Sequence, residues 1–417
     1  MSQRTLFFLL LALGLLALDI YIFQGIKVLT AQTSGFWRKI IHGIYWFISI
    51  VGFLSLIASA TFLPLDKWPE FIRVYWPATF FILAIVKLVY LPFLITDDLV
   101  RLIKLVTQAA YAGPSESVSG TRISRLKFLN LAGALVAAVP GIALIYGMIR
   151  GAYDYQIKKI PLKFSNLPKS FDGYKIVQIS DIHTGSFMSR EPLERAVGMI
   201  NKLNADLVLF TGDLVNNKTD EALDYVEVLK KISARKGVYS ILGNHDYGDY
   251  AEWPNEEMKR KNMDKMYRVH KEMGWDLLLN ENRRVEENNE RIDLIGVENW
   301  SASNRFPKYG DLKMAHQGTS NPFKILLSHD PSHFDAQVNT DFQDIDLTLS
   351  GHTHGMQFGV EIPGFKWSPS QWVYKQWAGL YSRKNQYLYV NRGLGFLGYP
   401  GRVGIWPEIT LIELKKG

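Results

Sequence analysis

The chain has 417 residues, a formal net charge of +7 and no cysteine. Its length exceeds that of one ordinary domain and predicts two or three structural units. The lack of cysteine excludes disulfide bonds, thiolate zinc sites and cysteine nucleophiles. Lys and Arg residues are scattered and form no dense run. Nucleic-acid binding is therefore not indicated, and the basic balance favours contact with anionic lipid.

Residues 1–150 are strongly apolar, whereas residues 151–417 have the composition of a soluble protein. A helix that crosses a bilayer needs about 20 mostly apolar residues. Four segments meet this requirement: 5–26, 40–65, 74–96 and 128–149. Buried helices of a soluble domain are the alternative, but four such runs leave too little polar sequence to cover them. We therefore predict a membrane domain of four transmembrane helices over residues 1–150.

Two charged residues interrupt these apolar segments, Asp19 in the first and Lys87 in the third. A charge at membrane depth costs about 2.5–3.5 kcal/mol on insertion scales, so such residues usually pair or face water. This leaves two interpretations. The two side chains pair with each other, or each lies near an interface and extends its charged end to water.

Basic residues near the predicted spans bear on orientation, because cytoplasmic loops are enriched in Lys and Arg. The third and first loops carry such residues: Arg101, Lys104, Arg122, Arg125 and Lys127; Lys27, Arg38 and Lys39. Placing both loops inside predicts a multi-pass protein of the cytoplasmic (inner) membrane with an extracytoplasmic C-terminal part. Other basic residues then fall outside: Arg4, Lys67, Arg73, Arg150, Lys158 and Lys159.

Two further segments near the third loop bear on the same question. Ser124–Leu129 is similar to the twin-arginine export signal S-R-R-x-F-L, with Leu126 in place of the second arginine. This similarity favours export of the C-terminal part. Residues 97–110 alternate charged and apolar side chains at helical spacing, which predicts a helix along the inner membrane surface.

From about residue 160 onward, short apolar runs alternate with polar helical stretches. The runs predict strands at 174–180, 206–211, 237–242, 292–297, 323–328, 346–350, 386–391 and 409–414. The polar stretches predict helices at 190–203, 220–231 and 255–273. This mixed order predicts an α/β sandwich over residues 170–417, joined to the membrane domain by a linker at 151–169.

Residues able to bind metal ions come directly after five of these strands. They are Asp181 and His183 in D-x-H, Asp213 in G-D, Asn244, His245 and Asp246 in G-N-H-D, His329, and His352 and His354 in G-H-T-H. Strand ends are where α/β proteins commonly place ligand groups. Taken singly, each histidine has an ordinary alternative as a hydrogen-bonded loop residue. Five strand ends of this kind, however, indicate one shared metal site.

Oxygen and imidazole ligands suit Mn, Fe and Zn. Two cations about 3.5–4 Å apart can clamp the attacking and leaving oxygens of a phosphate ester. The full ordered series of motifs resembles the calcineurin-like metallophosphoesterases, in their membrane-anchored subgroup, over roughly residues 170–415. The resemblance implies a four-layer αββα sandwich, a hydrolase of phosphate esters and two divalent metal ions.

The resemblance also implies a role for each motif residue. Three ligands would hold the first metal, one carboxylate would bridge, and three ligands would complete the second metal: Asp181, His183 and His354; Asp213; Asn244, His329 and His352. We expect the two side chains of D-x-H to point the same way from an extended segment. The reaction would be attack on phosphorus by a metal-bound hydroxide. His245 would protonate the leaving oxygen or stabilise the transition state, and Asp246 would orient it.

Substrate contacts are predicted further along the chain. Arg392 and Arg402 lie in a stretch that resembles the C-terminal end of the membrane-linked subgroup, and either could pair with a substrate phosphate. Trp372 and Trp377 belong to an aromatic stretch after G-H-T-H. That stretch either rests on lipid or grips an acyl chain, or else it packs against the sheet in the ordinary way.

These features predict a membrane-bound phosphodiesterase or pyrophosphatase that acts on a lipid or cell-envelope precursor. One alternative is a UDP-diacylglucosamine-type pyrophosphohydrolase on the cytoplasmic side, which conflicts with the predicted orientation. The other is a membrane receptor or transporter with a regulatory or degenerate phosphoesterase domain. Degenerate domains lose metal ligands, and this sequence retains all seven: Asp181, His183, Asp213, Asn244, His329, His352 and His354.

Overall fold

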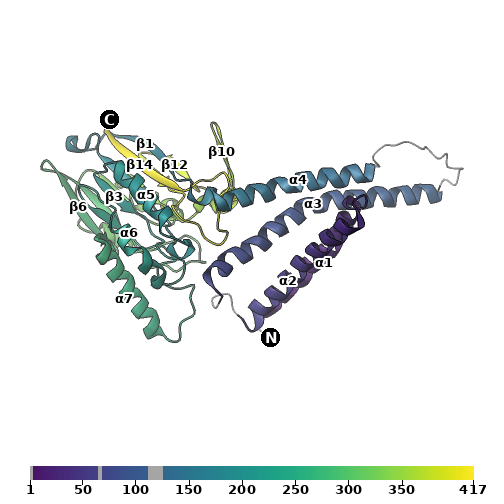
Figure 1. Cartoon of the computed structure of the whole chain (residues 1–417). Helices are drawn as coiled ribbons and strands as arrows, with labels where there is room; N and C mark the ends of the chain where they lie inside the picture. Colours follow the sequence, from purple (N-terminus) through teal and green to yellow (C-terminus); the bar gives the residue numbers. More distant parts are fainter. Residues whose placement is uncertain (1–2, 64–67, 111–124) are drawn as a thin grey trace. The chain divides into compact units, whose positions relative to one another are not determined.

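The computed structural model describes residues 3–63, 68–110 and 125–417, which form two units, Met1–Tyr146 and Gly147–Gly417. Ser124 of the export-signal-like segment lies outside the described residues, as do Arg122 and Lys67. The first unit contains long helices, and the second contains two β-sheets with helices on their outer faces (Figure 1).

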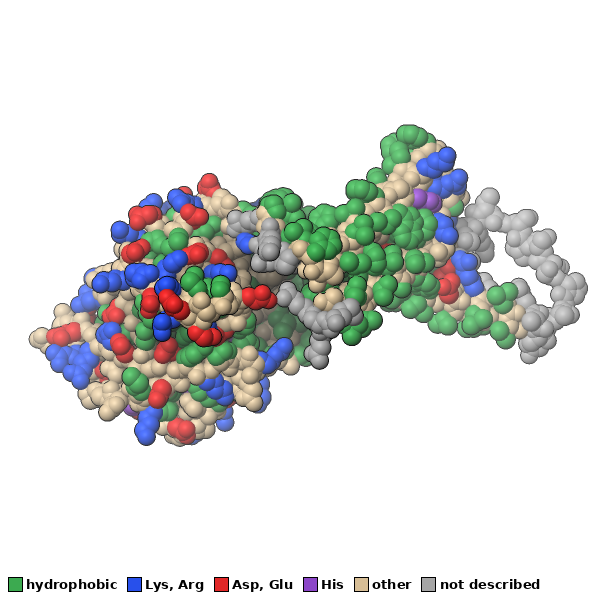
Figure 2. Space-filling view, turned by 90° about the horizontal axis from the view of Figure 1, so that it is seen from below, with side chains coloured by type: hydrophobic (Ala, Val, Ile, Leu, Met, Phe, Trp, Pro, Cys, Tyr) green, Lys and Arg blue, Asp and Glu red, His purple; other side chains and the backbone are tan. Residues whose placement is uncertain are grey.

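Within the described residues, the first unit contains four helices, as the apolar runs predict. They are α1 (Gln3–Leu29), α2 (Gly35–Thr61), α3 (Glu70–Ala110) and α4 (Arg125–Ile149), and each is long and apolar enough to cross a membrane. Large apolar side chains point outward, with Phe7 62%, Phe47 69% and Val139 66% exposed. Figure 2 shows this apolar surface over the helical unit. Helices that are apolar all round suit a lipid environment.

The segment 97–110 is helical, as its spacing predicts, and its position along the membrane surface stays a prediction. It continues α3 without a break, and Asp97 and Arg101 form an i,i+4 ion pair at 2.8 Å within it. No glycine or proline interrupts the helix after Pro92. A helix of 41 residues extends about 60 Å, roughly twice the hydrocarbon thickness of a bilayer.

The charged residues of the membrane domain pair with each other, which decides between the two interpretations of Asp19 and Lys87. Lys87 Nζ forms an ion pair with Asp19 Oδ1. Tyr45 donates its hydroxyl to the same carboxylate oxygen at 2.9 Å and to the Asp19 carbonyl at 2.8 Å. Asp19 is buried, at 4% exposure. One polar cluster therefore connects α1, α2 and α3.

The second unit contains two six-stranded sheets in the orders β1-β14-β2-β3-β4-β5 and β12-β13-β9-β8-β7-β6. The strands of the first sheet are β1 (Gln156–Phe164), β14 (Glu408–Lys416), β2 (Lys175–Ile179), β3 (Leu207–Phe210), β4 (Val238–Ser240) and β5 (Trp275–Leu277). Those of the second are β12 (Gly379–Arg383), β13 (Gln386–Val390), β9 (Leu347–Ser350), β8 (Lys324–Leu327), β7 (Glu290–Gly296) and β6 (Glu281–Glu287). A separate hairpin joins β10 (Val360–Ile362) and β11 (Phe365–Trp367).

Alternation along the strands builds the four layers. Ile176 of β2 faces the core between the sheets, where Ile325 of β8 also packs, whereas Val177 faces the helices. Helices α5 (Glu191–Lys202), α6 (Val226–Leu229) and α7 (Glu256–Met273) cover the first sheet. Helix α8 (Leu312–His316) and the π-helical turn Phe334–Val338 cover the second, next to the short α9 (Asn339–Asp341). The predicted αββα sandwich is therefore confirmed.

The predicted linker at 151–169 contains a strand instead. Strand β1 pairs in parallel with β14 along its whole length, from Gln156↔Glu408 to Phe164↔Lys416. The sequence obscures this strand because Pro161 lies inside it. Proline is tolerated at the edge of a sheet, where one side of the strand needs no hydrogen bonds, and β1 is an edge strand.

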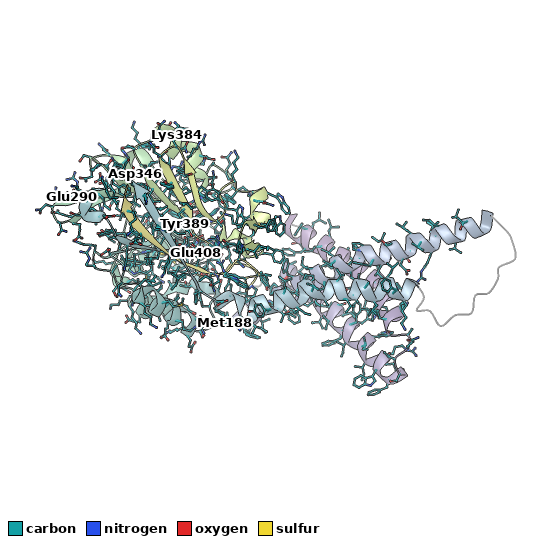
Figure 3. The ribbon with its side chains drawn as sticks, turned by 90° about the horizontal axis from the view of Figure 1, so that it is seen from above. Met188, Glu290, Asp346, Lys384, Tyr389 and Glu408 are labelled. Atoms are coloured by element: carbon teal, nitrogen blue, oxygen red, sulfur yellow. The ribbon has the colours of Figure 1, made fainter. Side chains whose placement is uncertain are left out.

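The two sheets are also joined by polar contacts. Tyr389 of β13 and Glu408 of β14 lie together between them (Figure 3), and the tyrosine hydroxyl donates to Glu408 Oε1 at 2.5 Å. Thr410 donates to the same oxygen at 2.6 Å. The bond from Tyr389 connects the C-terminal strand of the first sheet to a strand of the second, and the bond from Thr410 holds the Glu408 carboxylate within β14.

Candidate metal centre

The five motif-bearing loops converge at one edge of the two sheets. Strands β2, β3 and β4 are mutually parallel, as are β8 and β9, so their carboxyl ends meet. Two clusters result, each with its ligand atoms within 4.8 Å of one another: Asp181, His183 and His354; Asp213, His329 and His352. The first cluster contains the three residues predicted for the first metal, and the second combines the predicted bridge Asp213 with two of the residues predicted for the second metal.

Imidazole nitrogens and a carboxylate surround one point in the first cluster. His183 Nε2 lies 3.0 Å from His354 Nε2, which lies 3.3 Å from Asp181 Oδ1. In the second cluster, His329 Nε2 lies 3.1 Å from Asp213 Oδ2 and 3.2 Å from His352 Nδ1. Asp213 Oδ2 also lies 3.7 Å from His183 Nε2. Asp213 therefore reaches both clusters, as a bridging ligand must.

Hydrogen bonds on the far side of each ring orient these histidines. His183 Nδ1 lies 3.2 Å from the Val215 carbonyl, and His329 Nδ1 lies 2.7 Å from the Thr211 carbonyl. A carbonyl can only accept, so each Nδ1 carries a proton and each Nε2 faces the cluster. Metal-binding histidines are commonly held in this way.

The backbone at the site adopts unfavourable left-handed conformations, so the prediction of an extended D-x-H segment is wrong. The D-x-H segment is not extended, because Asp181 and His183 have φ values of 50° and 51°. Asp213, His352 and His354 also adopt the left-handed region, at 62°, 70° and 50°. Left-handed backbone at residues other than glycine costs energy and concentrates at functional sites. Five such residues in one place indicate that the fold is organised around this centre.

Glycine is required where the loops approach one another. A Cβ on Gly243 would collide with the Asp213 side chain and lie 2.6 Å from the Asp213 backbone nitrogen. Gly351, just before His352, would in turn collide with Ser180 and Asp181. The glycines of G-N-H-D and G-H-T-H therefore allow these loops to approach the loops of Asp213 and Asp181 closely. The residues that follow each glycine supply the candidate metal ligands.

Burial sets the protonation of the ligands. It lowers the pKa of His183 to about 3 and that of His352 to about 4, so both rings are neutral and keep a lone pair for a metal. It also raises the pKa of Asp181 to about 6. Burial acts the same way on Asp213, but His329, His245 and His183 outweigh it and hold the Asp213 pKa well below its usual range. The Asp213 carboxylate is therefore ionised, and it lies beside His329, whose pKa is raised to about 10.

In the G-N-H-D loop, Asn244 and His245 make different contacts. Asn244 donates to Tyr250 Oη at 2.9 Å, and its buried Oδ1 has no hydrogen-bond partner in the described part of the chain. His245 lies with its ring 5.0 Å from that of His183, and its Nδ1 is 2.6 Å from the Asn216 carbonyl. The backbone nitrogen of His245 donates to Asp213 Oδ1 at 2.8 Å.

Asp246 does not orient His245, contrary to the prediction. Its carboxylate accepts the backbone N–H groups of Asp213 and Gly243, both at 2.9 Å, and of Leu214 at 2.8 Å. The loop after β4 reverses direction and turns the Asp246 side chain back under the Asp213 loop. Asp246 is therefore a positioning residue that fixes one ligand loop to the other.

Both arginines proposed as substrate contacts are engaged by the protein. Arg392 donates to Glu361 Oε1 at 2.7 Å and pairs with Glu408. Arg402 is fully buried and donates to the carbonyls of Gly395 at 2.9 Å and Arg392 at 2.7 Å. A substrate phosphate would have to displace these partners, so the structure gives both residues a role in holding the loops.

The two predicted tryptophans differ. Trp372 is 74% exposed, at the end of the 3₁₀ turn Pro369–Trp372, whereas Trp377 is 4% exposed and packs with Ile405. Ordinary packing is therefore correct for Trp377 and not for Trp372.

Sequence reasoning missed two groups beside His352. Tyr374 Oη lies 2.7 Å from His352 Nε2, and Asp330 Oδ2 lies 3.5 Å from the same nitrogen. They fix the ring so that Nδ1 faces His329. Asp330 comes directly after the ligand His329, and that adjacency is a signal that could have revealed it.

This donor set fits two divalent ions. It combines imidazoles, carboxylates and the unpartnered Asn244 oxygen, which are ligand types that suit Mn, Fe and Zn. Asp181, His183 and His354 would hold one ion; Asn244, His329 and His352 would hold the other; and Asp213 would bridge. An αββα sandwich with such a centre defines a metal-dependent phosphoester hydrolase.

Comparison with known proteins agrees. Residues 174–356 match the family model "Calcineurin-like phosphoesterase", and residues 3–152 match "Probable Calcineurin-like phosphoesterase, transmembrane domain". The chain is 32% identical over 301 residues to "Uncharacterized metallophosphoesterase YkuE" of Bacillus subtilis, covering 70% of this chain and 98% of that protein. The chain therefore belongs to the calcineurin-like metallophosphoesterase family, and it is a multi-pass membrane protein.

Two further relatives show how far the similarity extends. The "Transmembrane protein with metallophosphoesterase domain" of Danio rerio is 32% identical over 293 residues, covering 68% of this chain and 62% of that protein. An uncharacterized metallophosphoesterase of Campylobacter jejuni is 28% identical over 425 residues, covering 98% of this chain and 97% of that protein. The similarity to the second relative therefore includes the membrane helices.

Proposed function

We propose that this protein hydrolyses a phosphodiester or pyrophosphate bond in a lipid or cell-envelope precursor that is presented from the bilayer. The observation that carries the proposal is the short connection between membrane and catalytic domain. Helix α4 ends at Ile149, and β1 begins at Gln156. Residues 150–155 reach at most about 20 Å when extended, so the catalytic domain works close to the membrane surface.

The chemistry divides between the metal ions and the protein. Two divalent ions held by the seven ligands would neutralise the phosphate oxygens and activate water. We assign to His245 the proton transfer to the leaving oxygen. Its Nδ1 is engaged by the Asn216 carbonyl, which leaves Nε2 for proton transfer. Asp246 and Tyr374 keep the ligand loops in place.

An exposed apolar surface comes after the ligand His354 in the chain and supports a lipid substrate. Trp372 is 74%, Val373 58%, Ile362 58% and Phe365 55% exposed. We call these four residues the apolar lip. The ring of Trp372 contacts that of Trp367 at a centroid distance of 5.9 Å, which connects the 3₁₀ turn to the β10–β11 hairpin. Exposed apolar groups of this kind mark binding surfaces for lipid or partners.

The catalytic domain is proposed to lie outside the cytoplasm, as the basic loops indicate. The cytoplasmic UDP-diacylglucosamine-type pyrophosphohydrolase is the competing proposal, and it requires the opposite orientation. A receptor or transporter with a degenerate domain is disfavoured, because all seven ligand positions are filled by competent residues and six of them lie in the two clusters.

The test compares two substrates that share one phosphate head group, one with acyl chains and one without. Trp372→Ala should lower kcat/KM for the acylated substrate by about tenfold, the loss expected for one buried apolar anchor, and leave the other unchanged. Tyr267→Ala, which removes another exposed aromatic residue on α7, is the matched control. Equal efficiency on both substrates, unaffected by Trp372→Ala, would favour a soluble phosphodiester as the substrate.

A further inference from the structure

A cavity of about 330 Å³ lies within the membrane domain, apart from the metal centre. It is bounded by α1, α3 and α4, and polar side chains make up much of its wall: Tyr21, Gln24, Lys27, Asp97, Asp98, Arg101 and Asn130. Val28, Ala31 and Leu94 add apolar surface. Such a mixture is unusual among helices that are otherwise apolar all round, and it calls for a polar occupant.

The cavity lies where the apolar runs of the helices end. Its α1 residues, from Tyr21 to Ala31, belong to the last turns of that helix and the turn after it. Asp97 comes directly after the apolar run 74–96 of α3, and Asn130 lies near the start of α4. Ends of apolar spans coincide with the head-group layer of a bilayer, so lipid head groups are the molecules this cavity meets.

Asp97, which lines the cavity, has a hydrogen-bond acceptor whose capacity is not used. Asp97 is only 3% exposed, and its Oδ2 accepts from Arg101 at 2.8 and 3.1 Å. Asp97 Oδ1 is buried and has no hydrogen-bond partner within the described ranges. Beside it, Asp98 Oδ2 accepts the Tyr21 hydroxyl at 2.6 Å. A buried acceptor without a donor is costly, so a donor on the occupant would be favoured here.

Cationic groups also line the cavity. Lys27 and Arg101 line the cavity, and the Arg101 side chain is 47% exposed, which leaves it N–H groups beyond its bond to Asp97. Guanidinium and ammonium groups bind phosphate oxygens. The cavity therefore presents carboxylates and cations side by side, which matches an occupant with one positive and one negative group.

We propose that this cavity binds the head group of an amine-bearing phospholipid. The primary ammonium would donate to Asp97 Oδ1 and Asp98, and the phosphate would lie against Lys27 and Arg101. A quaternary ammonium head group has no N–H to donate to Asp97. A head group with only negative charge would meet two carboxylates without a positive group of its own. A metal cation alone would leave Lys27 and Arg101 without a role.

The test uses the full chain purified in detergent, with phosphatidylethanolamine, phosphatidylcholine and phosphatidylglycerol of identical acyl chains added in mixed micelles. Native mass spectrometry counts retained lipid, and thermal unfolding reports stabilisation. We expect phosphatidylethanolamine to be retained at about one molecule per chain and to raise Tm more than the other two. Asp97→Asn should weaken its retention at least tenfold, and Arg38→Gln, on α2 outside the cavity, should not.

Two results would overturn the proposal. One is equal retention of the three lipids by the wild-type chain, which would mean that the cavity holds only water or acyl chains. The other is undiminished retention of phosphatidylethanolamine by Asp97→Asn. If Asp97→Asn fails to fold, Lys27→Gln provides the second variant, and its retention of the lipid should also fall. None of these measurements uses phosphoesterase activity, so the result is independent of the proposed substrate.

Discussion

Asp213 is the residue on which the metal centre depends most, because its Oδ2 contacts histidines of both clusters. We expect purified wild-type protein, reconstituted with manganese, to contain close to two metal ions per chain. Asp213→Asn should lower that content by at least one ion, because an amide bridges two cations poorly. Elemental analysis measures this directly. Wild-type protein without metal after reconstitution would contradict the assignment.

His245 has a different role, since its side chain lies beside the ligands without belonging to either cluster. His245→Ala should leave metal content unchanged and slow kcat by roughly 10²–10⁴-fold, the usual contribution of general acid–base catalysis. Steady-state kinetics together with elemental analysis provide the check. His316→Ala, at a histidine paired with Asp344 away from the site, is the control. Loss of a metal from His245→Ala would reassign this residue as a ligand.

At the scale of elements, the Asp19–Lys87 pair joins α1 to α3 inside the membrane domain. Removing one partner of a buried pair leaves an uncompensated charge, at a cost of about 3–5 kcal/mol, whereas replacing both can be nearly neutral. Lys87→Met should therefore lower Tm in detergent strongly. The double variant Asp19→Asn/Lys87→Met should recover most of the loss.

The exposed Lys39→Met on α2 should unfold like the wild type and serves as the control for the loss of a lysine. A double variant no more stable than Lys87→Met would show that the ion pair itself is not the source of the effect. In that case the hydrogen bonds from Tyr45 to Asp19 would be the remaining connection between α1 and α2 in this cluster.

At the scale of the whole molecule, four spans place both ends of the membrane domain on the same side of the bilayer. The basic first and third loops then predict that residues 151–417 lie outside the cytoplasm. A periplasm-active reporter fused after Gly417 should be active, and the same reporter inserted at Thr33, between α1 and α2, should not. The reverse pattern would favour the cytoplasmic pyrophosphohydrolase proposal.

Much of the candidate metal centre could be predicted because a short local sequence pattern marks its candidate ligands. Asp181, Asp213 and His352 each come within a few residues of the end of a short apolar strand, and that pattern is visible without any knowledge of pairing. The membrane helices were predictable for a similar reason, since a bilayer imposes length and apolarity on every span independently. Strand β1 escaped prediction, because its partner β14 lies some 250 residues away.

The direction in which a side chain points depends on contacts that are distant in sequence. In the motif G-N-H-D, Asp246 follows His245 directly. Only the folded structure shows that the Asp246 carboxylate accepts the N–H groups of Asp213 and Leu214. From the sequence, Arg402 is available to bind a substrate phosphate. In the fold, its guanidinium group donates to three backbone carbonyls instead: Gly393, Gly395 and Arg392.

The sequence by itself therefore determined the class of protein, the four spans and the residues that could bind metal, because each is encoded by composition or by short spacing. Only the tertiary structure decided which of these residues face one another. It paired Asp19 with Lys87, exposed Trp372 while burying Trp377, and left Asp97, a residue that lines the cavity, with an Oδ1 that has no partner in the described chain. The physical reason is that burial and pairing depend on neighbours that packing alone brings together.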